Sequence, residues 1–222
     1  MRSFTLPEKY FVVLKTSQLK AATPKALSLS EMAVLLQTAA GDLSQWAFTG
    51  HRPGNQVTVC ELKLAGAEAL VQLVPASDFE SIKIPFAPNS YKEDLPRKGI
   101  TFNISEGTRL QLKRIEERVQ MLLMSTWPQA QWHSALKPSD RYPTALRAKI
   151  RVRGARACRF YNAQGEAVPA PQEGEWDGVK CVPIVSIGAY VGDGVAGLLL
   201  DVQALMLGER TVVPPIDFSF LG

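Results

Sequence analysis

The chain has little of the chemistry from which metal sites and covalent catalysis are usually built. It contains two histidines, His51 and His133, and three isolated cysteines, Cys60, Cys158 and Cys181. No CxxC pair or other zinc-ligand spacing occurs among them. We therefore expect free structural thiols in a reducing compartment, and neither a metal nor another cofactor.

The motifs that mark nucleotide binding and nucleophilic hydrolysis are also missing. The 222 residues contain no GxxxxGK[ST] loop, no GxGxxG after an expected strand and no GxSxG turn. The glycine-rich segment 188–197 matches neither phosphate-binding motif, and a hairpin turn at a barrel corner would explain its glycines. An enzyme that uses 188–197 to hold a phosphate-bearing substrate stays an open alternative, but we expect a protein that is not an enzyme.

Long hydrophobic runs are absent from the sequence. No stretch of about 18 apolar residues occurs, which disfavours a membrane span. The N-terminal apolar patch is interrupted by Glu8, Lys9 and Lys15, and no small-residue cleavage site follows, unlike in a signal peptide. We expect an intracellular protein that is neither secreted nor membrane-bound.

What the sequence does have is a local excess of positive charge. The formal net charge is +4, but residues 137–159 hold eight basic residues and one acidic residue, whereas residues 160–222 hold two basic and eight acidic residues. The eight basic residues are Lys137, Arg141, Arg147, Lys149, Arg151, Arg153, Arg156 and Arg159. Such a concentration of charge is typical of a surface that binds an anionic partner.

Residues 146–154, LRAKIRVRG, place four of these cations on every second position. Arg147, Lys149, Arg151 and Arg153 alternate with Ala148, Ile150 and Val152. This period of two predicts a β-strand with one apolar face and one cationic face, on which neighbouring charges lie ~6.6–7 Å apart. An edge strand protected from aggregation by charge is one explanation. The predominance of arginine, which binds phosphate through a planar fork and stacks on bases, favours an anionic ligand such as a phosphate backbone.

The remaining pattern predicts many short strands and one prominent helix. Leu112, Ile115, Val119 and Leu122 repeat at helical spacing within 105–125, with Ser105 as the expected N-cap. Strands are expected at 9–15, 56–64, 69–75, 80–86, 155–162, 179–194 and 195–207, and a further helix within 23–41. We read 85–103 as a long loop and 127–143 as a linker.

These elements predict a mainly β fold with helical insertions. The expected architecture is a small OB-fold-like barrel, closed or partly open, whose corners use the glycines of the last two strands. We expect residues 1–208 to form a single domain and residues 209–222 to form an extended C-terminal tail.

The C-terminal third carries a family resemblance. It lies in two segments, YPTALRAKIRVRGARACRFYNAQGEAV and VKCVPIVSIGAYVGDGVAGLLLDVQALMLGE. The resemblance is a pattern of small and apolar residues with one glutamine, at Pro143–Ile150, Asn162–Gly165, Val182–Val191 and Gly197–Leu207, where the glutamine is Gln203. Over roughly 142–209 this pattern resembles OB-fold single-stranded DNA-binding proteins of bacteriophages and large DNA viruses. The resemblance implies an OB barrel with a helix inserted between strands, and coating of exposed DNA during replication or recombination.

The C-terminal end departs from the phage pattern. Phage members of that family often end in an acidic tail with a terminal aromatic residue, which recruits replication proteins. Here Phe218 and Phe220 are present, but Asp217 stands alone between apolar residues. Recruitment of replication proteins through Asp217, Phe218 and Phe220 would therefore rely on the aromatic residues and one carboxylate, without an acidic run.

The sequence thus predicts a protein that binds single-stranded DNA, with RNA as an open alternative. Phosphates would contact Arg147, Lys149, Arg151, Arg153, Arg156 and Arg159, and bases would stack on Tyr161, Trp176 and Tyr142. A homodimer is compatible with this hypothesis, as is location in the host cytoplasm for a phage protein, or in the nucleus or replication site for a eukaryotic virus. The alternative is a virion structural or assembly protein whose basic strand contacts an acidic partner or packaged genome.

Overall fold

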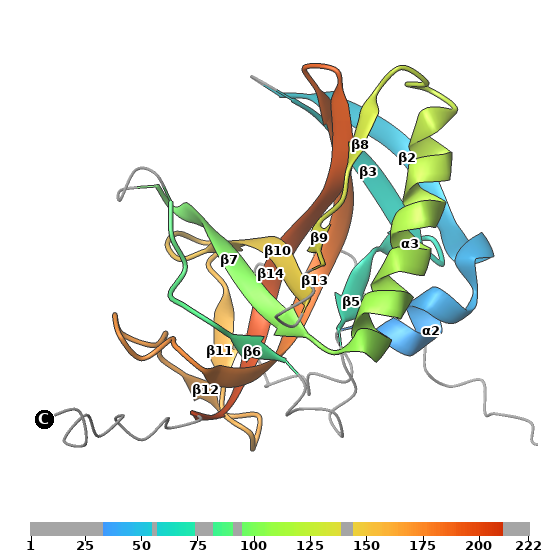
Figure 1. Ribbon diagram of the computed structural model, residues 1–222. Coiled ribbons are helices and arrows are strands. Elements are labelled where there is room, and N and C mark those ends of the chain that lie inside the picture. The colour runs from blue at the N-terminus through green and yellow to red at the C-terminus, as the bar shows by residue number, and fades with distance from the viewer. Residues whose placement is uncertain (1–32, 55–56, 74–81, 91–94, 139–143, 211–222) are drawn as a thin grey trace, which may run out of the picture.

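The computed structural model describes residues 33–54, 57–73, 82–90, 95–138 and 144–210 (Figure 1). The strand expected at 9–15, the candidate base-stacking residue Tyr142 and the tail residues Asp217, Phe218 and Phe220 lie outside these ranges. Among the described residues, no helix is both long enough and apolar enough to cross a membrane.

Five strands close into a barrel: β6 (Lys83–Ile84), β7 (Arg97–Ile104), β10 (Thr144–Arg151), β14 (Val195–Arg210) and β13 (Val179–Gly192). Each strand pairs with the next in this order, and β13 closes the ring on β6. All of these pairs are antiparallel except β10 with β14, which is parallel. The predicted mainly β, OB-fold-like barrel is confirmed.

The sheet continues beyond the barrel because β13 is long enough to pair with further strands. β13 pairs with β5 (Leu70–Gln72) and with β3 (Thr58–Leu64), and β3 pairs in turn with β2 (Trp46–Pro53). In Figure 1, β2 and β3 stand beside the β13–β14 hairpin, on the side away from β7. Short strands complete the edges: β1 (Val34–Leu35), β4 (Ala67–Glu68), β8 (Gln131–His133), β9 (Leu136–Lys137), β11 (Arg159–Tyr161) and β12 (Ala167–Val168).

The central helix forms where the sequence predicts it. α3 spans Glu106–Met124, and the Oγ of Ser105 accepts a hydrogen bond from the Thr108 backbone N–H at 3.2 Å, as an N-cap should. Its apolar stripe is buried at Leu112, Ile115, Val119 and Leu123. The helix packs against the short α2 (Leu36–Gly41), the 3-10 turn η2 (Leu43–Gln45), β2 and β14.

Four predicted elements differ from those observed. The strand expected at 146–154 begins at Thr144 and ends at Arg151, so Arg153 lies outside it. The expected loop at 85–103 contains most of β7, which has Ile100, Phe102 and Ile104 buried at alternate positions. The expected linker at 127–143 contains β8 and β9. The strand expected at 155–162 is reduced to Arg159–Tyr161, because the residues between it and β10 form a loop with Gly154 at φ +91°.

Candidate nucleic-acid interface

β10 has two chemically different faces. Leu146, Ala148 and Ile150 are buried in the core, whereas Arg147 and Lys149 are exposed and Arg151 is half-buried on the outside. The alternation follows from the two-residue period of a strand whose inner face lines the barrel interior. The cations of β10 therefore point outward, away from the apolar interior.

The neighbouring strand β7 adds a fourth cation to this face. In the antiparallel register Arg97 pairs with Arg151, Gly99 pairs with Lys149, and Thr101 pairs with Arg147. Paired residues point to the same side of a sheet, so Arg97 lies on the same outer surface as the β10 cations. We call the four side chains Arg97, Arg147, Lys149 and Arg151 the cationic face.

An aspartate from β14 meets this face. In the parallel register Asp201 pairs with Lys149. Its carboxylate accepts hydrogen bonds from Arg97: Nε reaches Oδ1 at 3.0 Å, and Nη2 reaches Oδ1 at 2.6 Å and Oδ2 at 2.7 Å. The two side chains are 34% and 33% exposed, so the ion pair is at the surface and accessible to a ligand.

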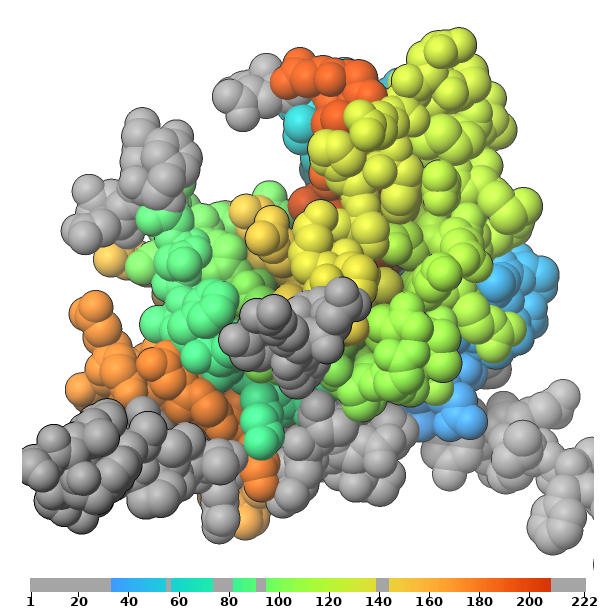
Figure 2. Space-filling view, viewed as in Figure 1, coloured from blue at the N-terminus to red at the C-terminus, as the bar shows by residue number. Residues whose placement is uncertain are grey.

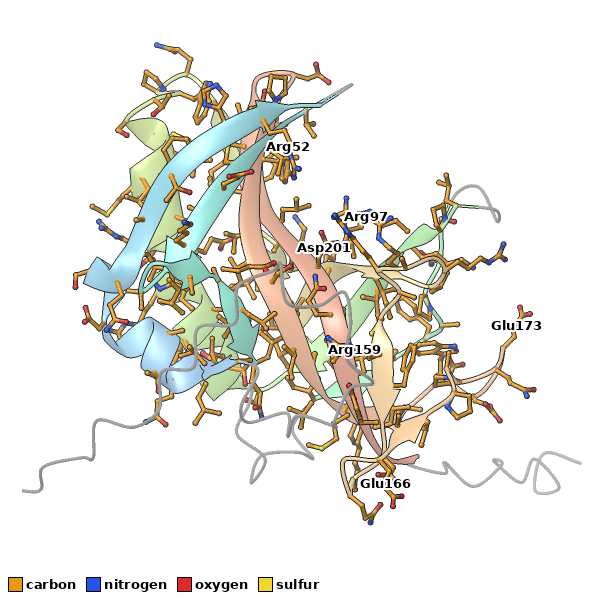
Figure 3. The ribbon with its side chains drawn as sticks, turned by 180° about the vertical axis from the view of Figure 1, so that it is seen from behind. Arg52, Arg97, Arg159, Glu166, Glu173 and Asp201 are labelled. Carbon is orange, nitrogen blue, oxygen red and sulfur yellow. The ribbon has the colours of Figure 1, made fainter. Side chains whose placement is uncertain are left out.

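The outer surface continues from β14 across β13 towards β3 and β2. The Gln203 Nε2 donates a hydrogen bond to Ser186 Oγ at 2.9 Å, which links β14 to β13 next to Asp201. Further along β13, the half-buried Tyr190 is in register with Val59 of β3, which is in register with the exposed Arg52 of β2. In Figure 3, Arg52 lies across an open gap from Arg97 and Asp201.

The molecular surface is hollowed between these two groups of residues. Figure 2 shows a notch between the end of β7 and the upper part of the molecule, where the β13–β14 turn and β8 lie. Arg97 stands on one side of this gap and Arg52 on the other (Figure 3). The arrangement offers positive charge to a ligand from both sides.

The remaining predicted cations extend the basic surface from β10 towards β11. Arg153 and Arg156 are exposed in the β10–β11 loop, where the Cys158 N–H donates to the Arg151 carbonyl at 2.8 Å. Arg159 is exposed on β11, whose register places it beside Ala204 of β14. The six cations singled out from the sequence thus form no single row: three lie on β10, two in the loop and one on β11.

The structure places two of the expected stacking residues in the interior. Tyr161 is only 8% exposed and packs with Ile184, Ala204 and Leu70. Trp176 is 6% exposed and lies edge-on to Phe160, with ring centroids 5.8 Å apart. A base needs a free ring face, which neither side chain offers in this conformation, so packing accounts for both residues.

Sequence reasoning missed three residues of this surface. Arg97 lay in a segment expected to be a loop, and Arg52 and Tyr190 were assigned no binding role. The alternation of Ile100, Phe102 and Ile104 could have indicated the β7 strand and with it the outward direction of Arg97. Nothing local to Arg52 or Tyr190 indicates that they share a face, because that depends on the pairing of β2, β3 and β13.

The cysteines are unsuited to nucleophilic chemistry. All three are free and buried. Burial raises the pKa of the Cys60 thiol to about 11 and that of Cys158 to about 12, and it raises the pKa of Cys181 further. The thiols are therefore protonated near neutral pH, whereas nucleophilic attack requires the thiolate. Within the described part of the chain, no three or more His, Cys, Asp or Glu side chains gather in a way that could hold a metal ion.

Comparison with known proteins gives matches in structure but not in sequence. No protein-family profile matches the chain, and no curated protein sequence does. The fold is similar to gp2.5, a single-stranded DNA-binding protein encoded by bacteriophage T7, with a TM-score of 0.45 and 12% identity over 67% of this chain and 90% of that one. It is also similar to the single-stranded DNA-binding protein of bacteriophage Enc34 in complex with ssDNA, with a TM-score of 0.43 and 10% identity over 75% and 97% of the two chains. The structural resemblance is to phage single-stranded DNA-binding proteins.

Proposed function

We propose that this protein binds single-stranded DNA, without sequence preference, on the cationic face. The observation that carries the proposal is the position of Arg97, Arg147, Lys149 and Arg151 on the outside of β7 and β10. These are the second and third strands of the barrel in chain order, and OB folds bind oligonucleotides on that pair of strands. Phosphate contacts by such a row give affinity that does not depend on base identity.

The same surface favours a single strand over a duplex. Proteins that read duplex DNA commonly insert a helix into the major groove. On α3, Arg109 pairs with Glu106, and Lys113 with Glu117. Arg118 donates to the Leu43 carbonyl at 3.1 Å. These three helix cations are engaged by the helix and its packing, whereas those of the cationic face lie on the outer face of the sheet.

Each group of residues has a proposed role. The cationic face binds phosphates, and Arg153, Arg156 and Arg159 extend the phosphate path towards β11. Arg52 approaches the strand from the opposite side of the notch, and Tyr190, half-buried on β13, supplies a ring at the floor of the surface. Coating of exposed DNA during viral or phage replication or recombination would use all of these contacts.

The test is a fluorescence-anisotropy titration of a labelled oligo-dT of about 30 nucleotides, long enough for the site sizes that OB folds cover. Duplex DNA and RNA of equal length are titrated alongside, each at several salt concentrations. We expect tight, salt-sensitive binding with a preference for the single strand. No binding to oligo-dT at low salt would overturn the proposal and would direct attention to an acidic protein partner for β10.

A charge-reversal variant assigns the site. Arg147→Glu with Lys149→Glu removes two phosphate contacts, so we expect the salt slope to fall by about 1.4 and the affinity at 0.1 M salt to fall at least ~25-fold. The matched control is Lys113→Glu with Arg114→Glu, the same change of charge on exposed positions of α3. Equal losses in the two variants would show a general charge effect and refute the assignment to β10.

A further inference from the structure

Asp201 is a carboxylate on a surface that otherwise presents cations to a ligand. It lies in register with Lys149 and holds Arg97 through hydrogen bonds to both carboxylate oxygens. Figure 3 shows Arg97 and Asp201 facing each other at the gap that separates them from Arg52. The placement is unexpected for a surface whose only task is to attract phosphate.

The ion pair removes most of the attraction that Arg97 would exert on a phosphate. Both Nε and Nη2 of the guanidinium are engaged by the carboxylate. Because the pair is electrically neutral, a phosphate gains little there unless it displaces Asp201 from Arg97. The free carboxylate would then face both the phosphate and Lys149.

We propose that Asp201 is an internal competitor of the nucleic acid for Arg97. It occupies the guanidinium in the free protein and limits both the affinity of the cationic face and its salt dependence. A strand that displaces Asp201 gains the Arg97 contact, and Asp201 recovers Arg97 when the strand leaves. The carboxylate thereby keeps the complex readily reversible, which a protein that coats DNA requires when other proteins must reach the strand. This inference rests on the proposed function.

A double-mutant cycle on the ion pair tests the proposal with the same oligo-dT titration. Asp201→Asn keeps the size of the side chain and frees Arg97 for a phosphate. Without the competing carboxylate, the Arg97 contact is fully available to a phosphate. One such contact contributes about 0.7 to the salt slope for a single strand, so we expect up to ~5-fold tighter binding at 0.1 M salt. Arg97→Gln leaves an unpaired carboxylate on the face, and we expect binding to weaken by at least the same factor.

The combined variant separates competition from positioning. If Asp201 competes, Arg97→Gln with Asp201→Asn removes a neutral pair, and the affinity returns to within about twofold of the wild type. If Asp201 instead orients Arg97 towards a phosphate, Asp201→Asn weakens binding and the double variant matches Arg97→Gln. That second pattern overturns the proposal.

Two controls complete the experiment. Asp42→Asn changes the net charge by the same amount at an exposed cap of η2, and Asn also caps well, so we expect no change in affinity. Asp201→Ser provides a second route to the free guanidinium if the asparagine variant does not fold, as judged by its circular dichroism and Tm. If both Asp201 variants lose the native fold, the carboxylate is a structural requirement and the proposal is wrong.

The proposed function and this inference fail in different ways. If Arg147→Glu with Lys149→Glu leaves binding unchanged, the cationic face is not the site. If that variant weakens binding as expected while both folded Asp201 variants bind no tighter than the wild type, the site stands and the competition does not.

Discussion

At the scale of single residues, burial decides the behaviour of the three thiols. Their raised pKa values result mainly from removal of the thiolate from water. We expect the native protein at pH 8 to react slowly with a disulfide reagent such as DTNB, and denaturant to release three rapidly reacting thiols. The folded pKa values lie above those of the unfolded chain, so the stabilisation from burying neutral thiols is complete below about pH 8.5. This stabilisation declines as the pH rises towards the folded pKa of Cys60, about 11.

The reactivity of each thiol can be followed separately. Single replacements of Cys60 and Cys158 by alanine, with mass spectrometry of the labelled peptides, assign the rates. A thiol that is labelled within seconds in the folded protein would contradict the buried environment described for all three.

Gly197 lies where any side chain would clash with neighbouring atoms. A Cβ at this position would lie 2.6 Å from the carbonyl oxygen of His133 and 2.9 Å from the hydroxyl of Tyr190. We expect Gly197→Ala to lower the free energy of unfolding by about 1–3 kcal/mol, because β8 and the tyrosine ring must both move. Urea unfolding followed by circular dichroism measures the change.

Gly107 is the matched control for that substitution. A Cβ there meets nothing within 4 Å, and the residue lies in the first turn of α3. Gly107→Ala should therefore be neutral or stabilising, by up to about 1 kcal/mol. Equal destabilisation by the two substitutions would show that the close approach at Gly197 is not the cause.

At the scale of elements, Glu116 joins α3 to the segment that follows it. Its buried carboxylate accepts hydrogen bonds from Ser134 Oγ at 2.7 Å and from the Ala135 backbone N–H at 3.0 Å. We expect Glu116→Ala to cost about 2–3 kcal/mol of unfolding free energy, since a buried N–H and a hydroxyl lose their acceptor. Glu116→Gln keeps one acceptor oxygen and should cost clearly less, as urea denaturation of both variants would measure.

An equal loss for Gln and Ala at Glu116 would mean that the negative charge, and not hydrogen bonding, anchors the segment. Hydrogen exchange of the Ala135 amide provides an independent measurement. Its protection should fall in the alanine variant and largely persist in the glutamine variant.

Elements with strong local patterns could be predicted from the sequence, and those that depend on pairing could not. α3, β10 and the β13–β14 hairpin form where expected, because helical spacing, strict alternation and the Asp193-Gly194 turn are local signals. β7 was missed because Pro96 and Gly99 are more typical of loops.

The candidate site was predictable to the same extent. The outward direction of Arg147 and Lys149 follows from alternation alone, whereas Arg97 becomes their neighbour only through the β7–β10 register. Tyr161 was expected to be available for stacking because a strand has two faces and one is usually exposed. Here the second face is also covered, by residues from β5, β13 and β14.

At the scale of the whole molecule, the position of β14 is central to both the fold and the proposed binding surface. It pairs with β13 on one side and with β10 on the other, and it carries Asp201 between them. The ion pair between Arg97 and Asp201 on the cationic face therefore forms only when β14 has taken its place in the barrel.

The same position has a consequence for synthesis of the protein on the ribosome. β14 is the most C-terminal strand of the described chain, so β10 and β13 emerge first and wait with unpaired edges until it arrives. Such edges can recruit strands from other chains, and closing a barrel from segments distant in sequence is slow. A nascent chain halted before β14 is thus the form most exposed to aggregation and most in need of chaperone protection.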